Sequence, residues 1–109
     1  TDALAVAWAR GLVAVGDQRG RVHLTGRSEP LLPALADPHP VVTLAAGADL
    51  VVAGDPGGNL RAASVEVDGA GWTLAQRRPV FQVAVAPDGQ RTAALVRDHD
   101  ERTALLVVD

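Results

Sequence analysis

The densest group of side chains that could do chemistry lies at Asp98-His99-Asp100-Glu101. Carboxylates beside an imidazole are ligands that a divalent cation accepts. The group falls where the rest of the chain has Gly- and Asp-rich hairpin turns, and polar residues at such turns ordinarily face solvent. We therefore expect a solvated turn, and we predict no bound metal ion and no cofactor.

Histidine and serine are the next candidates, for acyl-transfer catalysis. That chemistry needs a histidine oriented by a carboxylate and placed beside a hydroxyl nucleophile. His23 lies in an expected strand and His39 between two prolines, while Ser28 and Ser64 are the only serines. Neither serine sits in a Gly-x-Ser-x-Gly turn. We expect no catalytic residues and a protein that is not an enzyme.

A glycine-rich turn offers a third possibility, phosphate binding. Gly54-Asp55-Pro56-Gly57-Gly58 matches neither a dinucleotide fingerprint nor a P-loop, and no helix is expected after it. We interpret it as a structural turn.

Arginine and tryptophan are the residue types that could build an interaction surface. Arg77 and Arg78 are adjacent, and Trp72 follows a Gly-rich turn, so these three form the candidate interface. Trp is enriched at binding hot spots, although Trp72 could equally pack in the core. Trp8 lies in an expected strand in which Leu4, Val6 and Trp8 share one face, and we predict that it packs in the core.

Two further arginines, Arg61 and Arg91, could extend a basic patch, but we expect them on the solvated surface. The chain has no lysine and only three aromatic residues. Nucleic-acid binding is therefore not expected.

Composition limits the class of protein. The chain has 109 residues, a net charge of −3 and no cysteine, so disulfides and thiol chemistry are excluded. No apolar stretch reaches the roughly 20 residues that span a bilayer, and no secretory segment is evident. We predict no membrane partner and a cytoplasmic location. All ten basic residues are Arg, and isoleucine is absent, which suggests a GC-rich bacterial source.

An internal repeat organises the chain. The segment that begins at Leu12 matches the segment that begins at Leu50, an offset of 50 − 12 = 38 residues, and a looser third copy begins near Pro79. We predict units at 1–39, 40–78 and 79–109, the last one incomplete. Each unit starts with an alternating strand, continues through an apolar strand such as 12–15 or 50–53, and turns into a third strand.

Fourth strands are expected to be irregular. The stretch 28–40 carries four prolines, so its strand must lie at a sheet edge or be absent. In the second unit, 71–76 is expected to follow a hairpin as a fourth strand. We predict no α-helix longer than one turn. The fold class is therefore all-β, in antiparallel four-stranded units.

A repeat of about 40 residues with four short strands is typical of β-propeller blades. Gly16 to Leu24 and Gly54 to Leu60 resemble the glycine-containing turn between the second and third strands of WD40 repeats. The turn at 86–89 resembles the first hairpin turn of WD40 and TolB-like blades. The segment 105–109 resembles the third strand of that family, which ends in Trp-Asp, with Val in place of Trp before Asp109. The Trp-Asp and Gly-His dipeptides of that family are absent.

This resemblance implies a non-catalytic protein-interaction scaffold or sensor module. Propellers have four to eight blades, so about three blades imply an incomplete propeller. We expect the remaining blades, another protein, or a second copy of the chain as partner. A propeller portion of a larger enzyme such as a hydrolase, or a lectin-like propeller that binds a small ligand or carbohydrate, are the alternatives.

Overall fold

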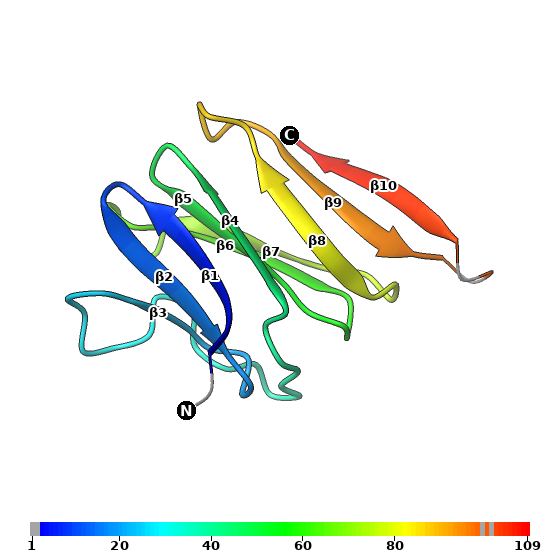
Figure 1. The fold of residues 1–109 in the computed structure, drawn as a ribbon, viewed down its shortest axis with the longest axis horizontal. Helices are drawn as coiled ribbons and strands as arrows, with labels where there is room; N and C mark the ends of the chain where they lie inside the picture. Colours follow the sequence, from blue (N-terminus) through cyan, green and yellow to red (C-terminus); the bar gives the residue numbers. More distant parts are fainter. Residues whose placement is uncertain (1–2, 99, 101) are drawn as a thin grey trace.

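The computed structural model describes residues 3–98, 100 and 102–109, which form ten strands and no helix. The strands make three antiparallel sheets, and Figure 1 shows these sheets stacked one beside the next. The first sheet contains β1 (Ala3–Ala9), β2 (Leu12–Asp17) and β3 (Val22–Leu24). The second contains β4 (Thr43–Gly47), β5 (Leu50–Gly54), β6 (Asn59–Ser64) and β7 (Gly71–Ala75). The third contains β8 (Val80–Val85), β9 (Thr92–Arg97) and β10 (Thr103–Val108).

The second sheet is buried on both faces, which gives the molecule two separate hydrophobic cores. Val51 points into the core shared with the first sheet, and its neighbour Val52 points into the core shared with the third. Both side chains are fully buried, because adjacent residues of a strand face opposite sides of the sheet. The predicted apolar strand 50–53 is confirmed, and it is buried on both faces of its sheet.

One aspartate closes the same hairpin turn in every sheet. The Asp17 carboxylate accepts hydrogen bonds from the Arg19 and Arg21 amides, and Asp55 accepts one from the Asn59 amide. Asp98 likewise accepts from the Asp100 and Arg102 amides. The third turn therefore lies 98 − 55 = 43 residues after the second, whereas the second lies 55 − 17 = 38 residues after the first.

Two glycines let consecutive sheets approach closely. A Cβ built on Gly16 would lie 2.4 Å from Cγ1 of Val41, and one on Gly54 would lie 2.5 Å from Cγ1 of Val80. The same valines donate their amides to the carbonyls of the turn aspartates, Val41 to Asp17 and Val80 to Asp55. The contact between the first and second sheets is thus repeated between the second and third.

The described sheets differ in whether a fourth strand is present, in line with the irregular fourth strands expected from the sequence. Only the second sheet has four, and its β7 lies within the predicted range 71–76. In the first sheet the proline-rich stretch pairs with β3 only at the bridge between Val22 and Leu32, because proline lacks the amide that a ladder needs. The expectation that this strand is an edge strand or absent is confirmed. In the third sheet the described residues form three strands.

The predicted place of Trp8 in the core is wrong. Trp8 is 72% exposed and lies with Leu4 and Val6 on the side of β1 that faces away from the second sheet. The alternation of β1 was assigned correctly, but it is the alanines, among them Ala9, that pack on the second sheet.

Candidate interaction surfaces

The two outermost sheet faces of the stack carry apolar side chains that no other sheet covers. We call the first the front face, and it consists of the outward side chains of β1 and β2: Leu4, Val6, Trp8, Val13 and Val15. We call the second the back face, and it consists of the outward side chains of the third sheet: Gln82, Ala84, Ala93, Leu95, Leu105 and Val107. Val6 and Leu105 are each 66% exposed.

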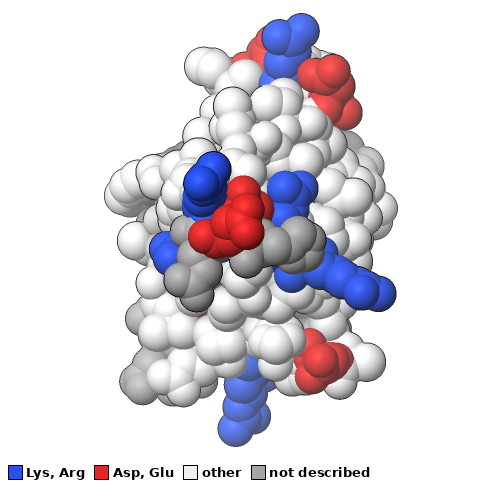
Figure 2. All heavy atoms as spheres, turned by 90° about the vertical axis from the view of Figure 1, so that its right-hand side faces the viewer, with Lys and Arg blue, Asp and Glu red and all other residues white. Residues whose placement is uncertain are grey.

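Figure 2 shows the molecule from the side of the third sheet. Charged side chains are scattered over this side, and large areas between them carry no charge. A shallow hollow of about 130 Å³ lies on the back face, lined by residues that include Ala84, Ala93 and Leu105. Exposed apolar surface of this extent on a sheet is typical of an interaction site.

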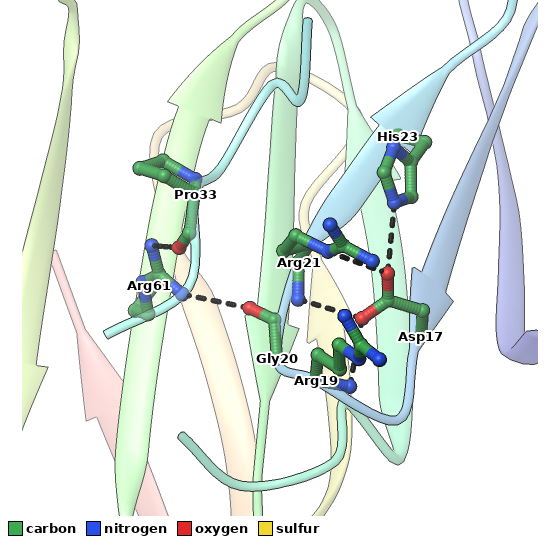
Figure 3. Close-up of polar contacts among 7 residues, drawn as sticks. All are labelled: Asp17, Arg19, Gly20, Arg21, His23, Pro33 and Arg61. Atoms are coloured by element: carbon green, nitrogen blue, oxygen red, sulfur yellow. Dashed lines mark hydrogen bonds and ion pairs between the residues drawn. The ribbon is translucent and has the colours of Figure 1, made fainter. Parts of the chain in front are cut away.

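A polar cluster lies at the edge of the front face, where β2 turns into β3 (Figure 3). Asp17, which is 1% exposed, accepts hydrogen bonds from the Arg21 side chain at 3.0 Å, and its carboxylate lies 2.8 Å from Nε2 of His23. Burial alone would raise the pKa of Asp17. The bonds from His23, from the Arg21 and Arg19 amides and from the Arg21 side chain outweigh it and lower that pKa to about 2. At neutral pH Asp17 is therefore an anion that holds the hairpin turn.

This cluster also bears on the predicted absence of catalysis. The Asp17 carboxylate orients His23, as a carboxylate orients the general base of a catalytic triad. This contact was not predicted from the sequence. The serines are engaged elsewhere or lie in loops: the Ser64 hydroxyl donates to Asp49 at 2.7 Å, which lowers the pKa of that carboxyl, and Ser28 lies in an exposed bend. His39 instead lies against Gly57 in the turn of the second sheet.

The expected surface position of Arg61 is wrong. Arg61 lies within β6 and is only 6% exposed. Its guanidinium reaches the first sheet and donates to the carbonyl oxygens of Gly20 at 3.1 Å and Pro33 at 2.5 Å (Figure 3). Burial lowers the pKa of Arg61, and the charge of Asp55 opposes this effect. Arg61 therefore connects two sheets. Its position equals that of His23 plus 38, the repeat length, which is the signal that could have identified it.

The three residues of the candidate interface do not form one compact patch. Trp72 is half-buried near the start of β7, packs against the core between the second and third sheets, and borders a hollow of about 340 Å³ with Asp49 and Ser64. Arg77 and Arg78 follow the other end of β7, roughly 16 Å away at about 3.3 Å per strand residue.

The arginine pair differs in exposure. Arg77 is exposed, whereas Arg78 is half-buried and is held by Gln76, whose side-chain oxygen accepts the Arg78 amide at 3.1 Å. Arg91 is exposed, as expected, and pairs with Asp109. Arg77 and Arg78 follow β7 of the second sheet, whereas Arg91 precedes β9 of the third sheet.

Of the acidic stretch at 98–101, the described residues Asp98 and Asp100 lie between β9 and β10. The Asp98 carboxylate accepts hydrogen bonds from the Asp100 and Arg102 amides, and Asp100 is exposed. His99 and Glu101 lie outside the described residues. Within residues 3–98, 100 and 102–109, no three His, Asp or Glu side chains gather as metal ligands would. The turn at 54–58 is closed by a hydrogen bond from the Asn59 amide to Asp55. Among the described residues, no helix is long and apolar enough to cross a membrane.

Comparison of the sequence with protein-family models and with curated proteins finds no match. Comparison of the fold with solved structures finds matches. A chain of the mitotic checkpoint complex matches 95% of this chain with a TM-score of 0.72 and 19% identity, and this chain covers 32% of it. The β-propeller domain of Cps50 (Swd1) from Myceliophteria thermophila matches 97% with a TM-score of 0.70 and 17% identity, and 39% of that chain is covered.

These similarities agree with the three stacked sheets, the repeated hairpin aspartate and the repeated glycine–valine contact. This chain spans well under half the length of either solved chain. The three sheets therefore have the fold of β-propeller blades.

Proposed function

We propose that this chain is a non-catalytic protein-interaction scaffold whose blades, at 1–39, 40–78 and 79–109, continue into a closed ring through contacts at the front and back faces. The observation that supports this most is that both end faces of the stack carry apolar side chains in a fold that elsewhere buries them. Association that covers such faces is favourable because it removes apolar surface from water.

A partner protein would bind at the edge of the second blade. Trp72 and Arg77 lie on the outer strand of the second blade or just beyond it, and residue types of this kind supply much of the binding energy in protein interfaces. The two structural relatives are a propeller domain and a chain of a protein complex, which is consistent with a scaffold.

The partner proposal is tested by affinity capture from a cell extract, with quantitative mass spectrometry. The immobilised wild-type chain is compared with Trp72→Ala, with the double variant Arg77→Ala/Arg78→Ala, and with Arg91→Ala as an exposed control. We expect proteins that the wild type and the control retain and that one of the first two variants loses at least tenfold. Equal recovery with all four chains refutes these residues as the interface. Circular dichroism confirms that each variant is folded.

A further inference from the structure

The front face has the pattern of a surface that is buried elsewhere in the same molecule. Adding the repeat length of 38 to Val6 and Trp8 gives Leu44 and Ala46, which pack against the first sheet. The third-sheet residue equivalent to Trp8 and Ala46 is Val83, which packs against the second sheet. In two blades out of three, therefore, this face receives the preceding blade.

The back face is the matching surface of such a contact. Its β9 residues Ala93 and Leu95 correspond, at an offset of 43, to Leu50 and Val52, which face the third sheet. A second copy of the chain that placed its front face here would repeat the contact already made twice within one copy. The chain thus contains both halves of a head-to-tail interface.

The two faces are also complementary in shape. Trp8 is the largest side chain of the front face and projects from it, 72% exposed. The back face has a hollow of about 130 Å³ above the small residues Ala84 and Ala93. Within the molecule, the place of Trp8 is taken by Ala46 and Val83, so its size has no role in the contacts inside one copy.

If a second copy packed on the back face, the repeated glycine–valine contact would be replaced by a contact between residues of different size and charge. The residue equivalent to Gly16 and Gly54 is Arg97, since 97 − 54 = 43, and the residue equivalent to Val41 is Ala3, since 41 − 38 = 3. A large residue has replaced the glycine and a small one the valine. Position 3 pairs with Asp17 in the sheet, so Arg97, whose guanidinium lies 5.6 Å from the centre of the Phe81 ring, would lie near the end of β2 that carries Asp17.

From these observations we infer that copies of this chain associate head to tail, with the front face of one copy on the back face of the next. Trp8 fills the hollow above Ala84 and Ala93, and Arg97 approaches the end of β2 that carries Asp17. This inference rests on the proposed function and specifies one occupant of the two end faces, a second copy.

The size of the faces predicts how strong the association is. The back face has three strands of six residues, which at about 4.8 Å between strands and about 3.3 Å per residue cover roughly 14 by 20 Å. Burying this area on each of two faces removes on the order of 560 Å², below the roughly 1,200 Å² of stable complexes. We therefore expect a reversible, concentration-dependent association that is micromolar or weaker.

Sedimentation velocity from about 10 µM to about 1 mM measures this association directly. We expect the weight-average mass to rise above 11.2 kDa with concentration for the wild type. Trp8→Arg should remain at the mass of one chain. The matched control is Val67→Arg, since Val67 is 57% exposed and lies on neither face, and it should behave as the wild type. A wild type that stays monomeric, or equal weakening by both variants, overturns the inference.

Disulfide trapping tests the orientation, because the chain has no cysteine of its own. Val6→Cys and Leu95→Cys are prepared separately and mixed under mild oxidation. Head-to-tail packing predicts that the mixed disulfide forms at least several-fold faster than a disulfide between Val6→Cys and Thr73→Cys, whose cysteine lies on β7. Dominant pairing of Val6→Cys with itself would show like faces together and overturn the inference.

These outcomes are distinguishable from failure of the proposed function. A chain that stays monomeric refutes self-association, but it leaves the capture experiment with Trp72→Ala and the arginine variants unaffected. Conversely, loss of the partner proposal does not alter the sedimentation of Trp8→Arg.

Discussion

Replacing Arg61 by Met removes a guanidinium that connects the first and second blades through two backbone carbonyls. The guanidinium donates to the carbonyls of Gly20 and Pro33 and is 6% exposed. Methionine keeps most of the length and apolar volume of the side chain, so the change isolates the polar contacts from packing.

The magnitude follows from two opposing effects. A hydrogen bond that involves a charged group contributes about 1.5–3 kcal/mol, so two of them contribute roughly 3–6 kcal/mol. The variant no longer has to bury a guanidinium, and the lowered pKa of Arg61 shows that this burial is costly. We expect a net loss of about 2 kcal/mol in the free energy of unfolding, which lowers Tm by roughly 10 °C for a domain of this size.

Urea denaturation, followed by the fluorescence of Trp72 and Trp8, measures this loss. Arg61→Lys should lie between Met and the wild type, because a single ammonium cannot donate to two separated carbonyls with the geometry of a fork. The control is Arg91→Met, whose exposed ion pair should contribute less than about 0.5 kcal/mol. An Arg61→Met variant as stable as the wild type would refute this role of Arg61.

Three further changes test other parts of the fold. Gly54→Ala places a Cβ 2.5 Å from Val80 and should lower the free energy of unfolding by about 1–3 kcal/mol in urea titrations; an unchanged midpoint would contradict the close approach of the second and third blades. Leu60→Ala empties a fully buried site and should cost about 2–5 kcal/mol by the same assay, whereas a cost below about 1 kcal/mol would place Leu60 outside the core. The pKa of Asp17 is lowered from 3.8 to about 2, so its stabilisation of about 2 kcal/mol is present above pH 4 and lost as pH falls toward 2. Asp17→Asn should therefore flatten the acid-side decline in Tm, and an identical decline in both proteins would argue against the cluster.

The strands and their order could be predicted from the sequence because local patterns encode them. The apolar run at 50–53 and the glycine and aspartate turns each specify a strand or a hairpin without reference to distant residues. The prolines of 28–40 likewise indicated the missing fourth strand of the first blade.

What the sequence did not predict depends on neighbours in space. Alternation placed Trp8 on one face of β1 but could not say which face another sheet covers, and the covered face carries alanines. Arg61 was assigned to the surface because charge usually indicates exposure, whereas its partners are carbonyls 41 and 28 residues away. The bond between His23 and Asp17 crosses a hairpin turn and needs the register of β2 and β3.

The three repeats stack as blades, and the middle one is covered on both faces. Methyl–methyl nuclear Overhauser effects of Val51 and Val52 test this arrangement most directly. We predict contacts of Val51 with first-sheet methyl groups such as those of Leu24, and contacts of Val52 with third-sheet methyl groups such as those of Val96. Contacts of both valines with the same sheet would contradict the stack.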